Sequence, residues 1–211
     1  IANVPGHIIP FASAVSMSPP RRRLVKKPFM VLFVGRLIER KGVQYLIHAT
    51  KLLREKNIPV TVSIVGSGPL RDALAYRIKK YNLDNEIRIY EEVSSKELPK
   101  FYKDAQVFVL PAIVDQWGDT EGLGVVLIEA MGLGIPVIAS RVGGIPSIIT
   151  HNKNGILVSQ KDPSSIATAL EKLYTDPRLR KRLAENGYKS VKNDYNWRLI
   201  VSATMRLYRT L

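Results

Sequence analysis

The 211-residue chain is 45% apolar and 24% charged, which excludes a disordered protein and suits one domain with an appendage. It contains no cysteine, which excludes disulfides, iron–sulfur and zinc–thiolate sites and thiol chemistry. A formal net charge of +14 favours phosphate-bearing partners such as nucleotides, nucleic acid or anionic membranes. No apolar run approaches the roughly 20 residues that a membrane span needs, so we expect no membrane-spanning segment.

The first 27 residues have the character of a linker. They lack the basic start of a signal peptide, contain a short strand-like run at His7-Ile8-Ile9, and end in the basic positions Arg21–Arg23 and Lys26–Lys27. The chain also begins with Ile, in the middle of a pattern. We therefore expect residues 1–27 to be an extension from a missing upstream domain.

From residue 28 onwards, short β-branched apolar runs alternate with segments of helical period, such as Val43, Leu46, Ile47 and Leu53. This alternation is typical of a parallel sheet covered by crossover helices. The expected strands are Met30–Val34, Val60–Val65, Ile87–Tyr90, Val107–Leu110, Pro136–Ala139 and Gly155–Val158.

After the last strand the period is helical to the end of the chain. We therefore predict an α/β fold, with a Rossmann-like domain over residues 28–192 and a C-terminal helix over residues 193–211. That domain would have a six-stranded parallel sheet with helices on both faces. The helical tail carries a cluster of basic residues, interpreted as a solvated helix face; the cluster is Arg178, Arg180, Lys181, Arg182, Lys189 and Lys192. Aromatic residues are too spread along it to form a stacking platform, so we expect no nucleic acid partner.

Ligands of open parallel sheets bind beyond the carboxyl ends of the strands, so the loops after the strands are where a site is expected. In the first of these loops, Gly35 is followed by Arg36 and Lys41 at the start of a helix. An anion gains there from both cations and from free helix amides. Ordinary surface positions for the two cations remain the alternative.

The loop after the second strand contains Gly66-Ser67-Gly68-Pro69. Glycines without a Cβ let the backbone approach a flat ligand closely, although a plain tight turn explains them equally well. The loop lacks the third glycine of a dinucleotide-binding fingerprint, where Arg71 stands instead.

The loop after the fourth strand opens a helix with Gly122-Leu123-Gly124-Val125, whose amides are left unpaired and suit a diphosphate. Two carboxylates, Glu121 and Glu129, bracket this anion site. Carboxylates would repel a bare phosphate but accept hydrogen bonds from sugar hydroxyls. A ribose on one side and a hexose on the other describe a nucleotide sugar. The alternative is a capping carboxylate and a solvated helix residue.

Five segments together resemble the donor-binding half of family-four retaining glycosyltransferases. They are, in the family's order, GRLIERKG, IVGSGP, IRIYEEVSSKELPKFYKDAQVFVLP, EGLGVVLIEAMGLGIPVIAS and RVGGIPSIITHNKNGILV. The resemblance implies one half of a GT-B fold, in which two Rossmann-like domains face each other across the active site. It also implies metal-independent transfer of a hexose from a nucleoside-diphosphate sugar, without a cofactor.

On this resemblance, Arg36 and Lys41 would bind the donor's diphosphate and stabilise it as it leaves. The amides of residues 122–125 would join them. Glu121 would hold the transferred sugar, and Glu129 the ribose. Gly35, Gly66, Ser67, Gly68 and Val93 would lie along the donor and its base.

The chain departs from the family's pattern at Glu91, where glycine is usual beside the base, and at Ser147, where glutamate is usual. The resemblance places the acceptor, a glycan, lipid or small polyol, on the missing amino-terminal domain. We therefore expect these residues alone to bind donor yet transfer poorly. We expect a cytoplasmic protein, and the basic excess supports the hypothesis of peripheral contact with an anionic membrane face. Two alternatives stay open: a non-catalytic nucleotide-sugar-binding regulator and a nucleotide-sugar epimerase of the same architecture.

Overall fold

The computed structural model describes residues 17–20 and 28–209. The predicted linker, with its basic run and the strand-like segment near its start, therefore lies outside the described residues except for 17–20. Within that short segment, the Ser18 amide donates to the carbonyl of Gly132 at 3.0 Å.

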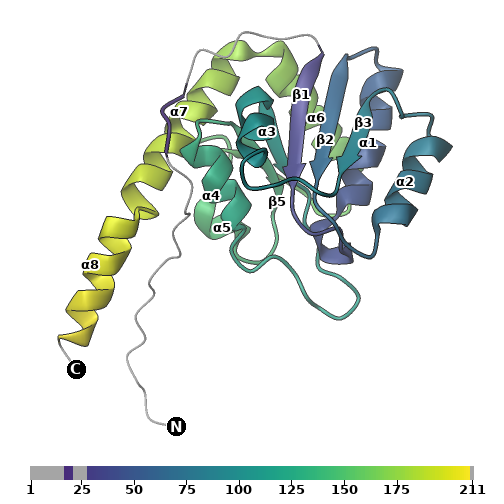
Figure 1. The fold of residues 1–211 in the computed structure, drawn as a ribbon. Coiled ribbons are helices and arrows are strands. Elements are labelled where there is room, and N and C mark those ends of the chain that lie inside the picture. The colour runs from purple at the N-terminus through teal and green to yellow at the C-terminus, as the bar shows by residue number, and fades with distance from the viewer. Residues whose placement is uncertain (1–16, 21–27, 210–211) are drawn as a thin grey trace.

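A six-stranded parallel sheet forms the centre of the molecule, which confirms the predicted fold class (Figure 1). Its order is β3-β2-β1-β4-β5-β6. The second and third strands are therefore added on one side of β1 and the last three on its other side, and the strand order reverses between β1 and β4. The strands are β1 (Phe29–Val34), β2 (Val60–Val65), β3 (Ile87–Tyr90), β4 (Val107–Leu110), β5 (Val137–Ser140) and β6 (Ile156–Val158). Each bound lies within one residue of its prediction. β4, β5 and β6 are buried throughout, as strands covered on both faces must be.

Helices cover both faces of the sheet. α1 packs on α2 and α6, whereas α3 contacts β1 from the other face, where α4 packs on α7. The bounds are η1 (Glu39–Lys41), α1 (Val43–Glu55), α2 (Arg71–Lys80), α3 (Leu98–Asp104), α4 (Val125–Gly132), α5 (Ile145–Ile148), α6 (Pro163–Thr175), α7 (Pro177–Asp194) and α8 (Trp197–Tyr208). The short elements η1 and α5 carry no long apolar period and were not expected.

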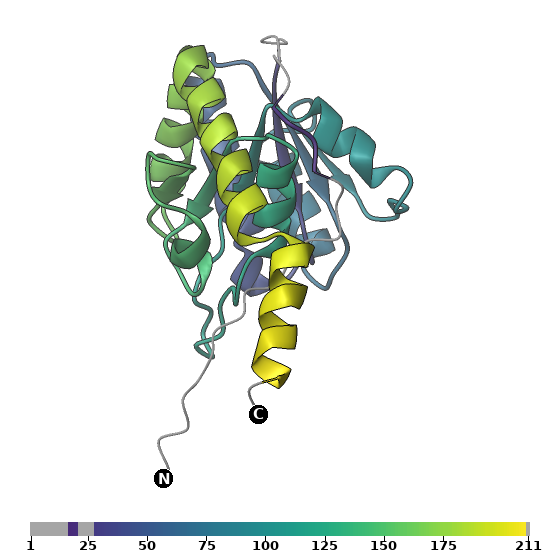
Figure 2. The same cartoon turned by 90° about the vertical axis from the view of Figure 1, so that its left-hand side faces the viewer.

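The helical tail consists of three helices, and Asp162 and Asp176 cap the first two by accepting from the amides of Ser165 and Leu179. α7 continues to Asp194, and α8 then extends away from the sheet (Figures 1 and 2). No helix among the described residues is both long and apolar enough to cross a bilayer.

Arg180 corrects one detail of the basic cluster in the tail. Its neighbours Arg178, Lys181 and Arg182 are exposed, but Arg180 itself is 6% exposed. Its Nη1 donates to the carbonyl of Leu173 at 2.6 Å, and its guanidinium lies 5.5 Å from the centre of the Phe29 ring. Burial lowers the pKa of Arg180. This cation therefore joins α6, α7 and β1 instead of facing solvent.

Candidate functional site

The loops that follow β1 and β2 are hydrogen-bonded to each other at the carboxyl edge of the sheet. The Leu37 amide donates to the carbonyl of Ser67 at 2.8 Å, and the Leu70 amide donates to the carbonyl of Leu37 at 3.0 Å. A Cβ at Gly66 would lie 1.9 Å from the carbonyl oxygen of Gly35. Glycine at position 66 is therefore required by the contact between these loops, whether or not a ligand approaches it.

Arg36 and Lys41 lie on the same loop but in different surroundings. The Arg36 side chain is exposed to solvent. The Lys41 side chain is only 16% exposed, and its ammonium forms a short ion pair with Oε2 of Glu121, which is 12% exposed. The structure therefore brings together two predicted site residues that are 80 positions apart in the chain.

The backbone holds this ion pair in place from both sides. Gly42, directly after Lys41, has φ +65°, and a Cβ there would lie 1.9 Å from the carbonyl oxygen of Pro111. The Ile113 amide donates to the carbonyl of Arg40 at 2.9 Å, which ties the loop after β1 to the loop after β4. On the other side, the Gly144 amide donates to the carbonyl of Glu121 at 3.0 Å.

α4 begins at Val125, after the glycines of the loop that follows β4, as predicted. Gly124 is the residue before the helix, with φ +77°, and no side chain caps it. In the part of the chain that the structure describes, the amides of Gly122, Leu123 and Gly124 donate no hydrogen bond. These amides and the free first turn of α4 therefore offer donors for an anion beside the ammonium of Lys41.

Glu129 lies in α4 and is partly buried. Its Oε2 accepts a hydrogen bond of 2.8 Å from the hydroxyl of Tyr102, a residue of α3 that is 2% exposed. Burial raises the pKa of the Tyr102 hydroxyl far above its usual value, and the charge and hydrogen bond of Glu129 raise it further. No sequence pattern indicates this contact, because Tyr102 repeats with Leu98, Phe101 and Ala105 like an ordinary core residue.

The segment after β3 brings a further pair together. Val93 is partly buried against the core, while Glu91 is exposed. The Arg71 Nε donates to Oε2 of Glu91 at 2.8 Å, so the residue that departs from the family's glycine joins the start of α2 to the end of β3. The exposed Ser67 lies on the loop beside them.

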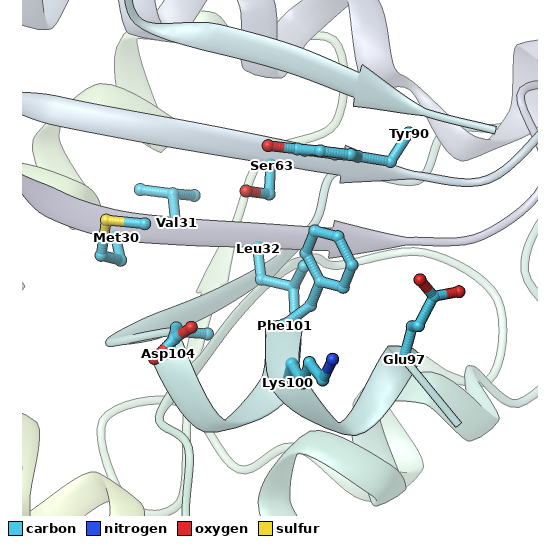
Figure 3. Close-up of a pocket in the computed structure, with 10 residues that line it drawn as sticks. Met30, Val31, Leu32, Ser63, Tyr90, Glu97, Lys100, Phe101 and Asp104 are labelled. Carbon is cyan, nitrogen blue, oxygen red and sulfur yellow. The ribbon is translucent and has the colours of Figure 1, made fainter. Parts of the chain in front are cut away.

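A cavity of about 330 Å³ lies between α3 and the adjacent sheet face (Figure 3). The rings of Tyr90 and Phe101 meet edge to face in its wall, with centroids 4.8 Å apart. No predicted site residue lines it, so it is separate from the loops at the strand ends. Its lining residues are Met30, Val31, Leu32, Ser63, Tyr90, Glu97, Lys100, Phe101, Asp104 and Ala105.

The described residues contain no group of three or more His, Asp or Glu side chains that could hold a metal ion. Asp115 instead organises its own loop, since its Oδ1 accepts from the amides of Trp117 at 3.0 Å and Asp119 at 2.9 Å. Asp119 pairs with Arg40 at 3.7 Å. Both aspartates of this loop therefore have local structural partners.

The family model for glycosyl transferases group 1 matches residues 18–190. An uncharacterized glycosyltransferase of Methanocaldococcus jannaschii is 36% identical over 181 residues, which are 85% of this chain and 44% of that protein. A GDP-mannose-dependent α-(1-6)-phosphatidylinositol monomannoside mannosyltransferase of Mycolicibacterium smegmatis is 32% identical over 170 residues, or 80% of this chain and 44% of that enzyme. The chain thus spans less than half the length of these relatives.

Among solved structures, sucrose-phosphate synthase of Thermosynechococcus elongatus superposes with a TM-score of 0.83 at 28% identity. The match covers 97% of this chain and 52% of that one.

Proposed function

This chain belongs to the glycosyl transferases group 1 family, and from that premise we propose that it is the donor-binding domain of a retaining, metal-independent hexosyltransferase. The observation that carries the proposal is the Lys41–Glu121 ion pair beside the free amides that precede α4. A fixed cation and free amides suit a diphosphate, and a carboxylate at the same point suits sugar hydroxyls.

The diphosphate of the donor is proposed to lie between Arg36, Lys41 and the amides of residues 122–125. As the bond from the sugar's anomeric carbon to the diphosphate breaks, negative charge grows on the leaving oxygen. Hydrogen-bond donors and cations around that position stabilise this charge, which is a usual source of large rate effects in enzymes. These groups need no metal ion for that task.

The two carboxylates are proposed to bind the two sugar rings. Glu121, in the loop before α4, accepts hydrogen bonds from hydroxyls of the transferred hexose. Glu129, within α4, accepts hydrogen bonds from those of the ribose. Glu91 borders the base in this arrangement, and its carboxylate, held by Arg71, offers an acceptor where other family members have none. The M. smegmatis relative, named as GDP-mannose-dependent, supports a nucleoside-diphosphate sugar as the donor class.

Calorimetry with UDP, GDP, ADP and their glucose and mannose conjugates tests the donor site. We expect saturable binding of at least one of them in the presence of EDTA. Arg36→Ala and Glu129→Ala each weaken it about tenfold, the effect of losing one charge-assisted hydrogen bond. Lys181→Ala, on an exposed face of α7, is the matched control and leaves the affinity unchanged. Absence of binding by the whole panel contradicts the proposal.

Product analysis separates transfer from the two alternatives, because all three predict donor binding. It requires the protein with its acceptor domain, since the 211 residues alone are proposed to transfer poorly. Acceptor-dependent release of the nucleoside diphosphate identifies a transferase. A donor with an inverted sugar centre identifies an epimerase, and an unchanged donor identifies a binding protein.

Peripheral contact with the cytoplasmic face of a membrane is a separate proposal. It is supported by the net charge of +14 and by the exposed cations of α7. Sedimentation with vesicles rich in phosphatidylserine is expected at low salt and is lost at high salt. Absence of sedimentation at low salt contradicts it.

A further inference from the structure

We propose that Tyr102 is the positioning residue for Glu129: it fixes one carboxylate oxygen so that the other is presented to the ribose hydroxyls of the donor. This inference rests on the proposed function, because that function assigns the ribose to Glu129. It adds a residue of α3 to a site otherwise built from the loops after β1, β2, β3 and β4 and from α4.

The geometry holds the phenol firmly. Tyr102 is 2% exposed, and its ring stacks on that of Phe108 in β4, with centroids 6.1 Å apart and planes 15° apart. Its hydroxyl donates to Oε2 of Glu129 at 2.8 Å. The Tyr102 ring is packed on a central strand and has little freedom to move. Its hydrogen bond therefore restrains the position of the Glu129 carboxylate.

The protonation of Tyr102 suits this role. Burial and the adjacent carboxylate keep the pKa of its hydroxyl well above its usual range. The hydroxyl therefore stays protonated and remains a hydrogen-bond donor at neutral pH. Because it is neutral, it leaves the negative charge of Glu129 available to a second donor.

The free carboxylate oxygen completes the arrangement. Among the described residues, no side chain or backbone amide donates to Oε1 of Glu129. An unheld glutamate on a partly exposed helix face samples several rotamers, and that freedom is lost when a ligand binds. Fixing Oε2 beforehand removes this loss from the binding step, which is preorganisation in its ordinary sense.

The packing role of Tyr102 can be separated from its hydroxyl. Phenylalanine fills the same space and keeps the stack on Phe108, so Tyr102→Phe removes the hydroxyl and its hydrogen bond to Glu129. Tyr174→Phe is the matched control, because Tyr174 also packs on a buried phenylalanine; its ring meets that of Phe29 edge to face, with centroids 5.8 Å apart. Thermal unfolding of both variants is compared with wild type before binding is measured.

The test is calorimetric titration of the 211-residue chain with UDP, GDP and ADP and with their 2′-deoxy and 3′-deoxy counterparts. For the ribonucleotide that wild type binds, we expect Tyr102→Phe to weaken binding about five- to tenfold. The same variant should weaken binding of the counterpart that lacks the contacted hydroxyl less than twofold. Tyr174→Phe should change neither affinity, and the double variant Tyr102→Phe/Glu129→Gln should bind no more weakly than Glu129→Gln.

The contrary outcomes are distinct. Equal losses for ribo and deoxy nucleotides would indicate a structural role and overturn the inference, as would unchanged affinity for both. In either case the wild-type binding would still support the proposed function. If wild type binds no member of the panel, the proposed function fails and the positioning role fails with it.

Discussion

Two carboxylates on either side of the start of α4 have different surroundings. Glu121, in the loop after β4, is 12% exposed and is paired with the ammonium of Lys41. Glu129, within the helix, accepts from the neutral phenol of Tyr102. The first carboxylate is neutralised by a cation that a diphosphate would also attract, whereas the second keeps its charge and a free oxygen.

The difference indicates a division of labour. A diphosphate approaching Lys41 competes with Glu121, and the released carboxylate becomes available to a sugar hydroxyl. Glu129 needs no such exchange, since its partner carries no charge. Substitution of Glu121 is therefore expected to change the affinity for phosphate groups, and substitution of Glu129 the affinity for the ribose.

A substitution at Gly42, which follows Lys41 directly, is expected to have the largest effect on the free energy of unfolding. Gly42→Ala places a Cβ 1.9 Å from the carbonyl oxygen of Pro111 at φ +65°, and it should lower the free energy of unfolding by about 3 kcal/mol. Gly118→Ala is the control, because φ there is +84° but nothing lies within 4 Å of the added Cβ; about 1 kcal/mol is expected. Urea unfolding measures both, and equal losses would mean that the contact with Pro111 yields freely.

Removing the cation itself comes next. Lys41→Ala leaves the carboxylate of Glu121 mostly buried without its partner, and should destabilise the protein by about 2 kcal/mol, somewhat less than for a fully buried pair. Lys181→Ala breaks an exposed pair with Glu185 and should cost less than about 0.5 kcal/mol. Similar urea midpoints for the two variants would show that the burial of the Lys41–Glu121 pair has no energetic consequence.

Neutralising each carboxylate should alter the binding of a different ligand. Glu121→Gln releases Lys41 and should tighten binding of inorganic pyrophosphate about threefold. Glu129→Gln should leave pyrophosphate binding unchanged and weaken the nucleoside diphosphate about tenfold. Calorimetry with both ligands measures these changes. If the two variants behave alike, the proposed division of labour is wrong.

The smallest effect concerns the seat of α3, which carries Tyr102. The Glu97 carboxylate accepts from the hydroxyl of Ser94 at 2.6 Å and from its amide at 3.1 Å, and these hydrogen bonds lower the pKa of Glu97 from its ordinary value. A carboxyl group whose pKa is lowered in the folded state stabilises the protein at pH values above its unfolded-state pKa. This stabilisation is lost as the pH falls through the folded-state pKa. Ser94→Ala should therefore lower the melting temperature by about 1 °C at pH 7 and by less at pH 3. A larger decrease in melting temperature at pH 3 than at pH 7 would contradict the conclusion that Ser94 stabilises the ionised carboxylate of Glu97.

Much of the fold could be predicted from the sequence because it depends on local pattern. Strands such as Val60–Val65 and Ile87–Tyr90 alternate apolar with polar residues between turn residues, and their bounds match the prediction. The helix after Gly124 was likewise expected from its glycines and the apolar run behind them. Short elements such as α5 escape this approach, since four residues cannot establish a period.

The candidate site was predictable in its members and not in their contacts. Arg36, Lys41, Glu121 and Glu129 follow strand ends, but nothing in the linear order states that Lys41 meets Glu121. Their pairing depends on β1 and β4 being neighbours in the sheet. The partner of Glu129 was hidden for a different reason, because Tyr102 occupies a core position and only its hydroxyl distinguishes it from phenylalanine there.

The strand order also bears on how the chain is made. β1, β2 and β3 are consecutive both in the sheet and in the sequence, so residues 29–90 can pair as they are synthesised. The other side of β1 stays an open edge until β4 arrives, and Glu121 emerges later still. A nascent chain that stalls before residue 107 would therefore display an apolar central strand ready to pair with other chains. For this domain, the interval between β3 and β4 is the stage of synthesis most exposed to aggregation.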